Sequence, residues 1–163
     1  MMAGMGQAMP EILFWGLVAT ALMTSILAGG QGLGFSRMSL PYLFGTFFTP
    51  NRHWAYIVGF FAYLVGGWLF AMLYYALFVY MATSGWWLGG VVGLLHGLFL
   101  LTVMLPLMPH IHPRMASEYD GPTSRRRLEP PGFLGLNFGT RTPAITLLGQ
   151  LVYGVVLGAF LPV

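Results

Sequence analysis

The sequence predicts an all-α, polytopic membrane protein with four transmembrane helices. Of its 163 residues, 57% are hydrophobic and only 7% are charged, whereas a soluble domain carries about 25% charged residues. A membrane-spanning helix needs roughly 20 apolar residues, and stretches without charged side chains divide the chain into four segments of that kind. We therefore expect residues 1–163 to form a single transmembrane domain without a sizeable soluble part.

The first span is predicted over residues 12–36, where no side chain is charged. The segment before it lacks the Lys or Arg that opens a secretory signal, so this span is expected to be retained. The glycine-rich stretch 29–34 at its end indicates a flexible or unwound exit from the helix.

The longest tract without Asp, Glu, Lys or Arg runs over residues 53–113 and is long enough for two spans. The sequence Ala-Thr-Ser-Gly at 82–85 is the predicted turn between them. The second span is then expected at about 53–81 and the third at about 86–108. The fourth span is shorter and is predicted at about 142–161.

All seven cations of the chain are arginines, and they lie in two connections. Arg37 and Arg52 lie between the first and second spans, and the other five lie in the connection 113–141 between the third and fourth. Positive residues mark the cytoplasmic side of a membrane. Both connections are therefore predicted to be cytoplasmic, and both termini to lie outside.

The two halves of the chain look like copies of one unit. Residues 16–38 align without a gap on residues 93–115, and each segment runs from Gly-Leu through an apolar span to Arg-Met. Downstream, Phe-Gly-Thr and Thr-Pro at 44–50 recur in the same order at 138–143. We expect a parallel internal repeat of two helices plus two, related by an axis along the membrane normal. The two repeats would cover about 11–83 and 86–163.

Small residues recur at every fourth position in the third and fourth spans, so each set lies along one helix face. In a membrane, helices associate where small residues let their backbones approach closely. These two spans are therefore expected to pack tightly, either against each other or against another neighbour. The glycines concerned are Gly89, Gly93 and Gly97 in the third span and Gly154 and Gly158 in the fourth.

The connection 113–141 combines charge with an apolar tail. Its triplet Arg125, Arg126 and Arg127 either binds anionic lipid headgroups or serves only as the orientation signal. The tail PPGFLGLNFGTRTP is expected to lie back on the membrane surface or to insert into the helix bundle, while the arginines stay exposed.

An ionisable side chain, His96, is predicted near the middle of the membrane. A residue at that depth is a functional candidate, able to relay protons, contact a substrate or ligate a haem iron. The alternative is a neutral imidazole that hydrogen-bonds across a helix interface, with Thr20, Thr24, Tyr63 or Tyr153 at a matching depth. The intramembrane polar set is His96, Gln150, Thr20, Thr24 and Thr102.

Three further histidines are predicted at the cytoplasmic face. The prolines around His110 and His112 favour extended backbone, which would put both imidazoles on one side, with His53 at the same level. Such a group could bind copper, zinc or another transition metal, or it is ordinary interfacial chemistry. In the alignment of the two copies, His96, His110 and His112 stand opposite Ala19, Leu33 and Phe35.

Sequence signatures of enzymes are absent. The chain has no cysteine, no GxSxG, HExxH or Walker motif, and no pair of carboxylates within a span. We therefore predict a non-enzymatic protein with no required cofactor and no nucleic-acid partner.

Three motifs carry a resemblance, namely HPRM after the third span, LEPPGFLGLNFGTRTP before the fourth, and LVYGVVLGAF within it. Together they resemble a family of small bacterial four-helix integral membrane proteins for which no activity is known. The resemblance extends over most of the chain. It implies a protein of the bacterial inner membrane, whose termini would then be periplasmic, and it implies no ligand or catalytic residue.

Three functional hypotheses follow. The first is an accessory subunit of a larger membrane complex or a small homo-oligomer, because four helices enclose little space for a pathway of their own. The second is a small carrier or channel with His96 in the pathway. The third is a haem, copper or zinc protein that uses His96 or the other three histidines. The lipid bilayer is a partner in each case, with other membrane subunits or a second copy of the chain in the first.

Overall fold

The computed structural model describes residues 2–117 and 121–163, and the described chain folds into helices without a β-strand. Four helical segments of the described residues are long and apolar enough to cross a membrane, the number that the sequence predicted. Residues 118–120 of the predicted connection lie outside the described residues. The four segments are Ala8–Gly32, Arg52–Met81, Trp86–Ile111 and Thr142–Phe160.

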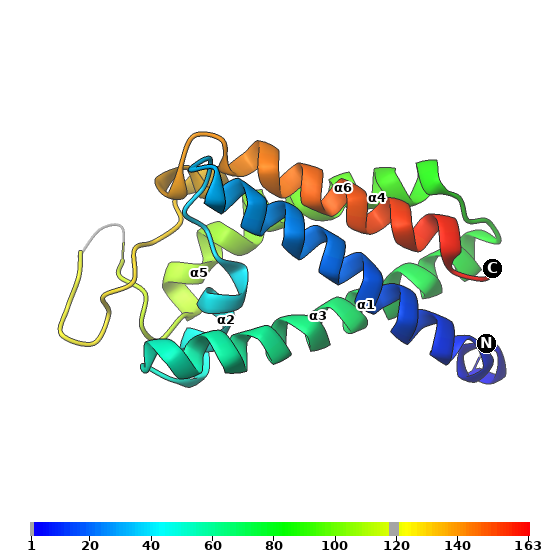
Figure 1. The fold of residues 1–163 in the computed structure, drawn as a ribbon, viewed down its shortest axis with the longest axis horizontal. Coiled ribbons are helices and arrows are strands. Elements are labelled where there is room, and N and C mark those ends of the chain that lie inside the picture. The colour runs from blue at the N-terminus through cyan, green and yellow to red at the C-terminus, as the bar shows by residue number, and fades with distance from the viewer. Residues whose placement is uncertain (1, 118–120) are drawn as a thin grey trace.

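The long helices form a bundle that α1 crosses diagonally (Figure 1). Helix α1 (Met2–Gly32) packs against both α3 (Arg52–Met81) and α6 (Thr142–Phe160), and α6 packs along α4 (Trp86–Phe99). Both termini lie at the same end of the bundle as the α3–α4 turn, which we call the terminal end. The other two connections lie at the opposite end, which we call the loop end.

Helix α1 begins and ends earlier than predicted. It starts at Met2 and stops at Gly32, so most of the stretch expected to be unwound is helical. It stays helical there because Gly30 packs tightly on the side chain of Ile145 in α6. The chain turns at Gly34, whose φ of +73° is a left-handed conformation that favours glycine.

A short helix in the first connection, α2 (Leu40–Phe48), was not predicted. Ser39 caps it by accepting a hydrogen bond from the Tyr42 amide, and a proline occupies its first turn. The helix packs closely on α3, because a Cβ at Gly45 would fall on the carbonyl group of Ala55. A side chain at this glycine would force the two helices apart.

The third span is longer than the predicted 86–108 and is not uniform. Helix α4 passes into a π-helical turn, η1 (Leu100–Met104), and then into α5 (Leu105–Ile111). Pro106 lacks an amide hydrogen, and its ring presses on the preceding turn. A widened turn accommodates this, and such turns often occur at functional sites.

The connection before α6 folds back onto the bundle. Its short 3-10 helix, η2 (Phe133–Phe138), packs against η1, α5 and α6, and Pro131 ahead of it is fully buried. The stretch 122–127, which contains the arginine triplet, is exposed. The apolar tail therefore lies against the helices, and the charged part lies away from them.

The two halves of the chain contact each other reciprocally at the loop end. The backbone amide of Arg37 donates to the Phe138 carbonyl at 2.7 Å, and its guanidinium group donates to the Asn137 carbonyl at 2.6 Å. The guanidinium group of Arg114 donates to the carbonyls of Thr46 at 2.5 Å and Phe47 at 3.0 Å. Each arginine thus bonds to backbone in or beside the Phe-Gly-Thr segment of the other half.

Candidate functional site

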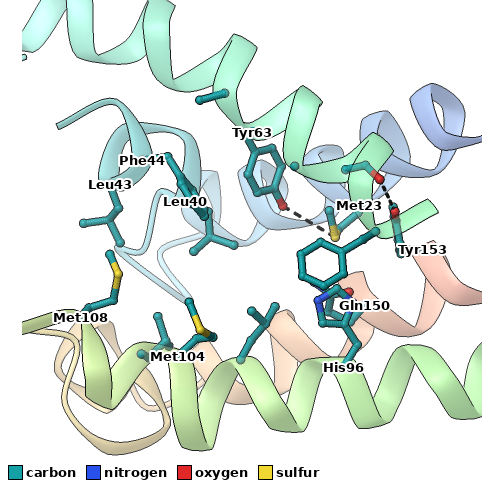
Figure 2. A pocket seen from close by; sticks show the side chains of 16 residues that line it. Met23, Leu40, Leu43, Phe44, Tyr63, His96, Met104, Met108, Gln150 and Tyr153 are labelled. Atoms are coloured by element: carbon teal, nitrogen blue, oxygen red, sulfur yellow. Dashed lines mark hydrogen bonds between the residues drawn. The ribbon is translucent and has the colours of Figure 1, made fainter. Parts of the chain in front are cut away.

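A cleft opens midway along the bundle, between α3 on one side and α4, η1 and α5 on the other (Figure 2). Helix α2 closes it toward the loop end, and side chains of α1 and α6 form its floor. We call it the central cleft, and its volume is about 90 Å³. Its largely apolar lining includes Met23, Leu40, Leu43, Phe44, Phe70, Leu100, Met104 and Met108.

The packing of α4 explains why this space exists. One face of α4 is held against α6 by glycines, since a Cβ at Gly89 would fall on the carbonyl oxygen of Gly154, and one at Gly93 on that of Gln150. Helix α3 packs instead on α2 and α1. His96, three residues after Gly93, lines the cleft in the last turn of α4, so the space opens beyond the glycine contacts, toward the loop end.

His96 lies at the inner end of the central cleft and is half-buried. Its Nδ1 atom is 3.4 Å from the hydroxyl oxygen of Tyr74, and its ring lies against Phe70 with the ring centroids 4.1 Å apart. Its other nitrogen, Nε2, is buried and has no hydrogen-bond partner. The protein therefore holds the imidazole at its Nδ1 side and leaves Nε2 without a partner.

Gln150 of α6 also lines the cleft, and its side chain is nearly fully buried at 4% exposure. Gln150 lies beside Gly97 of α4, since a Cβ added at Gly97 would be 3.2 Å from the Cβ of Gln150. Its Oε1 atom is buried without a hydrogen-bond partner. Figure 2 shows its side chain next to that of His96. Two unpaired polar atoms thus belong to neighbouring side chains at the inner end of an apolar cleft.

Two tyrosine hydroxyls of the same lining are already engaged. The Tyr153 hydroxyl donates to the Gly67 carbonyl at 2.6 Å, and the Tyr63 hydroxyl lies 3.7 Å from the sulfur of Met23 (Figure 2). The polar capacity that remains at this end of the cleft therefore comes from the unpaired atoms of the histidine and the glutamine.

The three threonines of the predicted polar set have different surroundings. Thr20 is buried beside Gly67, and its hydroxyl oxygen is unpaired. Thr24 bonds to the carbonyl of its own helix at Thr20. Thr102 is exposed and bonds to the Leu98 carbonyl at 2.7 Å. Thr102 therefore takes no part in the site.

His112 lies just beyond α5 and is fully buried at the loop end. Its Nδ1 accepts from the Arg114 amide at 3.1 Å, so Nε2 carries the proton and faces the Leu43 carbonyl at 3.2 Å and the Thr46 hydroxyl at 3.1 Å. Burial lowers the pKa of His112, the bond to the Leu43 carbonyl opposes this, and the charge of Arg114 lowers it further. His112 is thus a neutral link between the end of α5 and α2.

The predicted grouping of three histidines is not formed. His110 belongs to α5 rather than to extended backbone and is exposed, while His112 is buried, so the two imidazoles do not share one side. His53 is exposed in the first turn of α3. Within residues 2–117 and 121–163, no three His, Asp or Glu side chains are placed to hold a metal ion. The predicted extended backbone is found at His112, just before Pro113, but not at His110, because α5 continues through Pro109.

The predicted headgroup arginines are exposed and line two adjoining hollows at the loop end. Arg125 and Arg127 line a polar groove of about 780 Å³ together with Arg114 and Tyr42. Arg126 lines a separate hollow, which also includes Arg125. Arg125 thus lines both hollows, and headgroup binding by the triplet stays a prediction.

Sequence reasoning missed Tyr74 and Phe70 as the neighbours of His96. The two aromatics are four residues apart on α3, so they share a helix face. That spacing is visible in the sequence, but which face of α3 meets α4 is decided by how the two helices cross. Comparisons with protein-family models, with curated proteins and with solved structures found no match.

Proposed function

We propose that the protein is a non-enzymatic, multi-pass protein of the bacterial inner membrane that binds a lipid-soluble small molecule in the central cleft. One observation carries the proposal. The cleft is apolar along its length, and it ends at two buried, unpaired polar atoms, Nε2 of His96 and Oε1 of Gln150. Ligand sites commonly have this composition, a largely apolar lining with a few convergent polar groups.

The energetics favour a bound molecule. A buried polar atom without a partner costs about 1–3 kcal/mol, and the bilayer core supplies no water to relieve that cost. Two such atoms side by side are therefore an unfavourable arrangement in the empty cleft. A molecule that pairs with both would recover this free energy while its apolar part contacts the lining.

The exposure of the lining indicates the route into the cleft. Phe44, Ala62, Leu100 and Met104 line it and are partly exposed on the outer surface of the bundle. In a membrane this surface would face acyl chains, so the ligand would come from the bilayer. Methionine side chains adapt to varied apolar shapes, which suits a site of this kind.

Filling the cleft tests the proposal. A Cβ at Gly66 meets no atom within 4 Å, although Gly66 lines the cleft, so Gly66→Leu should occupy the space without a clash. Gly29→Leu is the matched control, because Gly29 also has open space around it and lies outside the lining. Native mass spectrometry of protein purified from membranes should find a bound apolar molecule in the wild type and in Gly29→Leu, and none in Gly66→Leu. Equal occupancy of the two variants would overturn the proposal.

We also propose that the fold is an internal duplication with cytoplasmic connections. The reciprocal bonds of Arg37 and Arg114 support the duplication, because these aligned arginines each bond to backbone in or beside the Phe-Gly-Thr segment of the other half. The arginines lie at the loop end, which supports a cytoplasmic position for that end. Cysteines introduced singly at exposed Thr123 and exposed Trp87 should label from opposite sides of intact cells, and labelling from one side would contradict this topology.

The carrier hypothesis is a second candidate, and one observation favours it. Two more unpaired polar atoms, the hydroxyls of Thr20 and Thr146, are buried in the same bundle. Together with His96 they give the bundle interior several polar atoms, as a proton pathway requires. Proton-coupled flux in liposomes should then be lost in His96→Ala, and unchanged flux would remove His96 from such a pathway.

The accessory-subunit and haem or metal hypotheses stay predictions. Stoichiometric partners in a native purification would support the accessory subunit, and a chain isolated alone would count against it. A visible absorption spectrum and elemental analysis of untagged protein would decide between a haem or metal protein and a colourless, metal-free one.

A further inference from the structure

We infer that the molecule bound in the central cleft carries a hydroxyl group, an alcohol or a phenol, at its inner end, and that this hydroxyl bridges Gln150 and His96. The inference rests on the proposed function and goes further, because it assigns the chemical class of the ligand. It follows from which atoms at the inner end of the cleft can donate a hydrogen bond and which can accept one.

The unpaired atom of Gln150 requires a donor. An amide oxygen accepts hydrogen bonds and cannot donate them, and this one is buried with no partner. A ligand group that pairs with it must therefore bring a hydrogen on oxygen or nitrogen. An ether, a ketone or an ester has none.

What the imidazole of His96 requires at Nε2 depends on its tautomer. A neutral imidazole has one donor nitrogen and one acceptor nitrogen. If the Tyr74 hydroxyl donates to Nδ1, across the 3.4 Å between them, then Nε2 carries the proton and needs an acceptor. In the other tautomer Nε2 is itself an acceptor, and both unpaired atoms then need donors.

A hydroxyl group answers both requirements at once, because it has one donor hydrogen and two acceptor lone pairs. It would donate to Oε1 of Gln150 and accept from Nε2 of His96, which fixes the tautomer in which Tyr74 is the donor to Nδ1. A carboxylate has no hydrogen to give, and an ammonium group has no lone pair. Either charge would also be costly to bury in this apolar lining.

The lining determines what the hydroxyl is attached to. From His96 the cleft continues past Leu100 and Met104 to Met108, roughly 18 Å along the helix at 1.5 Å per residue. This stretch offers a path for an extended hydrocarbon chain, which would lie partly in the cleft of about 90 Å³ and partly along its exposed lining. An isoprenoid alcohol has this form, with a hydroxyl at one end and an apolar chain behind it.

One arrangement within the protein would remove the need for a ligand. The oxygen and nitrogen of a glutamine amide are hard to distinguish by position. If the Gln150 side chain turned its NH₂ group toward Nε2 of His96, the two side chains would satisfy each other. The cleft would then be apolar throughout and indifferent to a hydroxyl.

The test compares two probes that differ only at the terminal oxygen, which carries a hydrogen in one and a methyl group in the other. Farnesol and its methyl ether are titrated against the full chain in lipid nanodiscs, and binding is followed by isothermal titration calorimetry. The wild type should bind farnesol about tenfold or more tightly than the ether, since an unpaired buried group costs about 1–3 kcal/mol. Gln150→Leu should bind both with similar affinity. Thr102→Val is the control, because Thr102 is exposed and lies in the span of His96, and it should keep the wild-type preference.

The outcomes separate the proposal of a lipid-soluble ligand from the proposal that this ligand carries a hydroxyl. The comparison of the two probes on the wild type tests the hydroxyl by itself, so the test does not depend on the folding of any variant. Equal affinity of the wild type for farnesol and the ether, with both lost in Gly66→Leu, would overturn the hydroxyl and leave the lipid-soluble ligand standing. Failure of the wild type to bind either compound would overturn both. A preference that persists in Gln150→Leu would remove Gln150 from the site.

Discussion

The two halves of the span Trp86–Ile111 pack in opposite ways. In the half nearer the terminal end, Gly89 and Gly93 meet Gly154 and Gly158 of α6, so closely that backbone touches backbone. In the half nearer the loop end, His96 and the residues beyond it line the central cleft between this span and α3. The glycine interface has no room for a methyl group, and the cleft has room for a ligand.

The difference shows how a small bundle can hold a site. Close backbone contact at the glycine interface provides the van der Waals packing that holds membrane helices together. With α4 fixed in this way, the loop-end half of the span need not be covered closely by a neighbouring helix. Toward the loop end the interface also loosens, because a Cβ at Gly97 would meet side chains of Leu147 and Gln150 rather than backbone. The cleft begins at this level.

The largest expected effect comes from adding one methyl group to the glycine interface. In Gly154→Ala the new Cβ would fall on the carbonyl oxygen of Gly89, so the helices must separate, at a cost of about 3 kcal/mol. Thermal unfolding in detergent should show a clearly lower midpoint. Gly29→Ala is the control, because its Cβ meets nothing within 4 Å, and it should melt at or slightly above the wild-type temperature. Equal melting of both variants would contradict close packing here.

Two adjacent glycines of α3 allow a finer test of the cleft itself. A Cβ at Gly67 would fall on the hydroxyl of Thr20, whereas one at Gly66 points into open space. Gly67→Ala should therefore destabilise the protein by about 1–2 kcal/mol, and Gly66→Ala should not. Adding Thr20→Ala should rescue the first variant. No rescue would mean that the clash lies elsewhere.

Acidification should loosen the cleft at its loop end, because His112 ties the end of α5 to Leu43 and Thr46 of α2. The pKa of His112 in the folded protein lies below its usual 6.5, so as the pH falls the unfolded chain takes up a proton first. The stability from neutral His112 is thus complete above about pH 6.5 and is lost as the pH falls through the folded pKa.

Melting temperatures between pH 8 and pH 5 check this prediction. The wild-type midpoint should fall on acidification. His112→Gln should start lower, because it lacks the same bonds, and should change less with pH. The exposed neighbour provides the control, and His110→Gln should follow the wild-type curve. If His112→Gln showed the wild-type slope, the pH dependence would belong to another group.

The smallest effect is expected from the ion pair between Arg37 and Glu129. Its nitrogen and oxygen are 3.0 Å apart, but the side chains are 67% and 45% exposed, and exposed pairs contribute about 0–1 kcal/mol. Glu129→Gln should therefore leave the melting temperature nearly unchanged at moderate salt. A large fall in melting temperature would show that this ion pair, which lies at the loop end away from the glycine interface, contributes more to stability than its exposure indicates.

Local patterns allowed much of the helical framework to be predicted. The absence of charge located the four long helices, and α6 begins and ends within a residue of its predicted bounds. Glycines at every fourth position mark one face of α4, and this face meets α6. Ser39 followed by Pro41 is a pattern typical of a helix start, and α2 begins there.

The site depended on information that a single sequence does not carry. The contact between His96 and Tyr74 depends on the crossing of α3 and α4, which no local pattern determines. The burial of His112 follows from the way α2 folds over the end of α5. The π-helical turn, Leu100–Met104, follows from the nearby Pro106, but a proline in the sequence does not determine whether a helix widens, kinks or ends.

The ring nitrogens of His96 provide the most direct test of a ligand at the inner end of the cleft. Solid-state NMR of ¹⁵N-histidine-labelled protein in lipid bilayers can identify them by their absence in His96→Phe. On addition of farnesol, the account predicts that Nε2 of His96 is the protonated nitrogen and that its resonance shifts, while those of His53 and His110 do not move. An unshifted His96 resonance at saturating farnesol, or an Nε2 already bonded to Gln150 without any ligand, would contradict it.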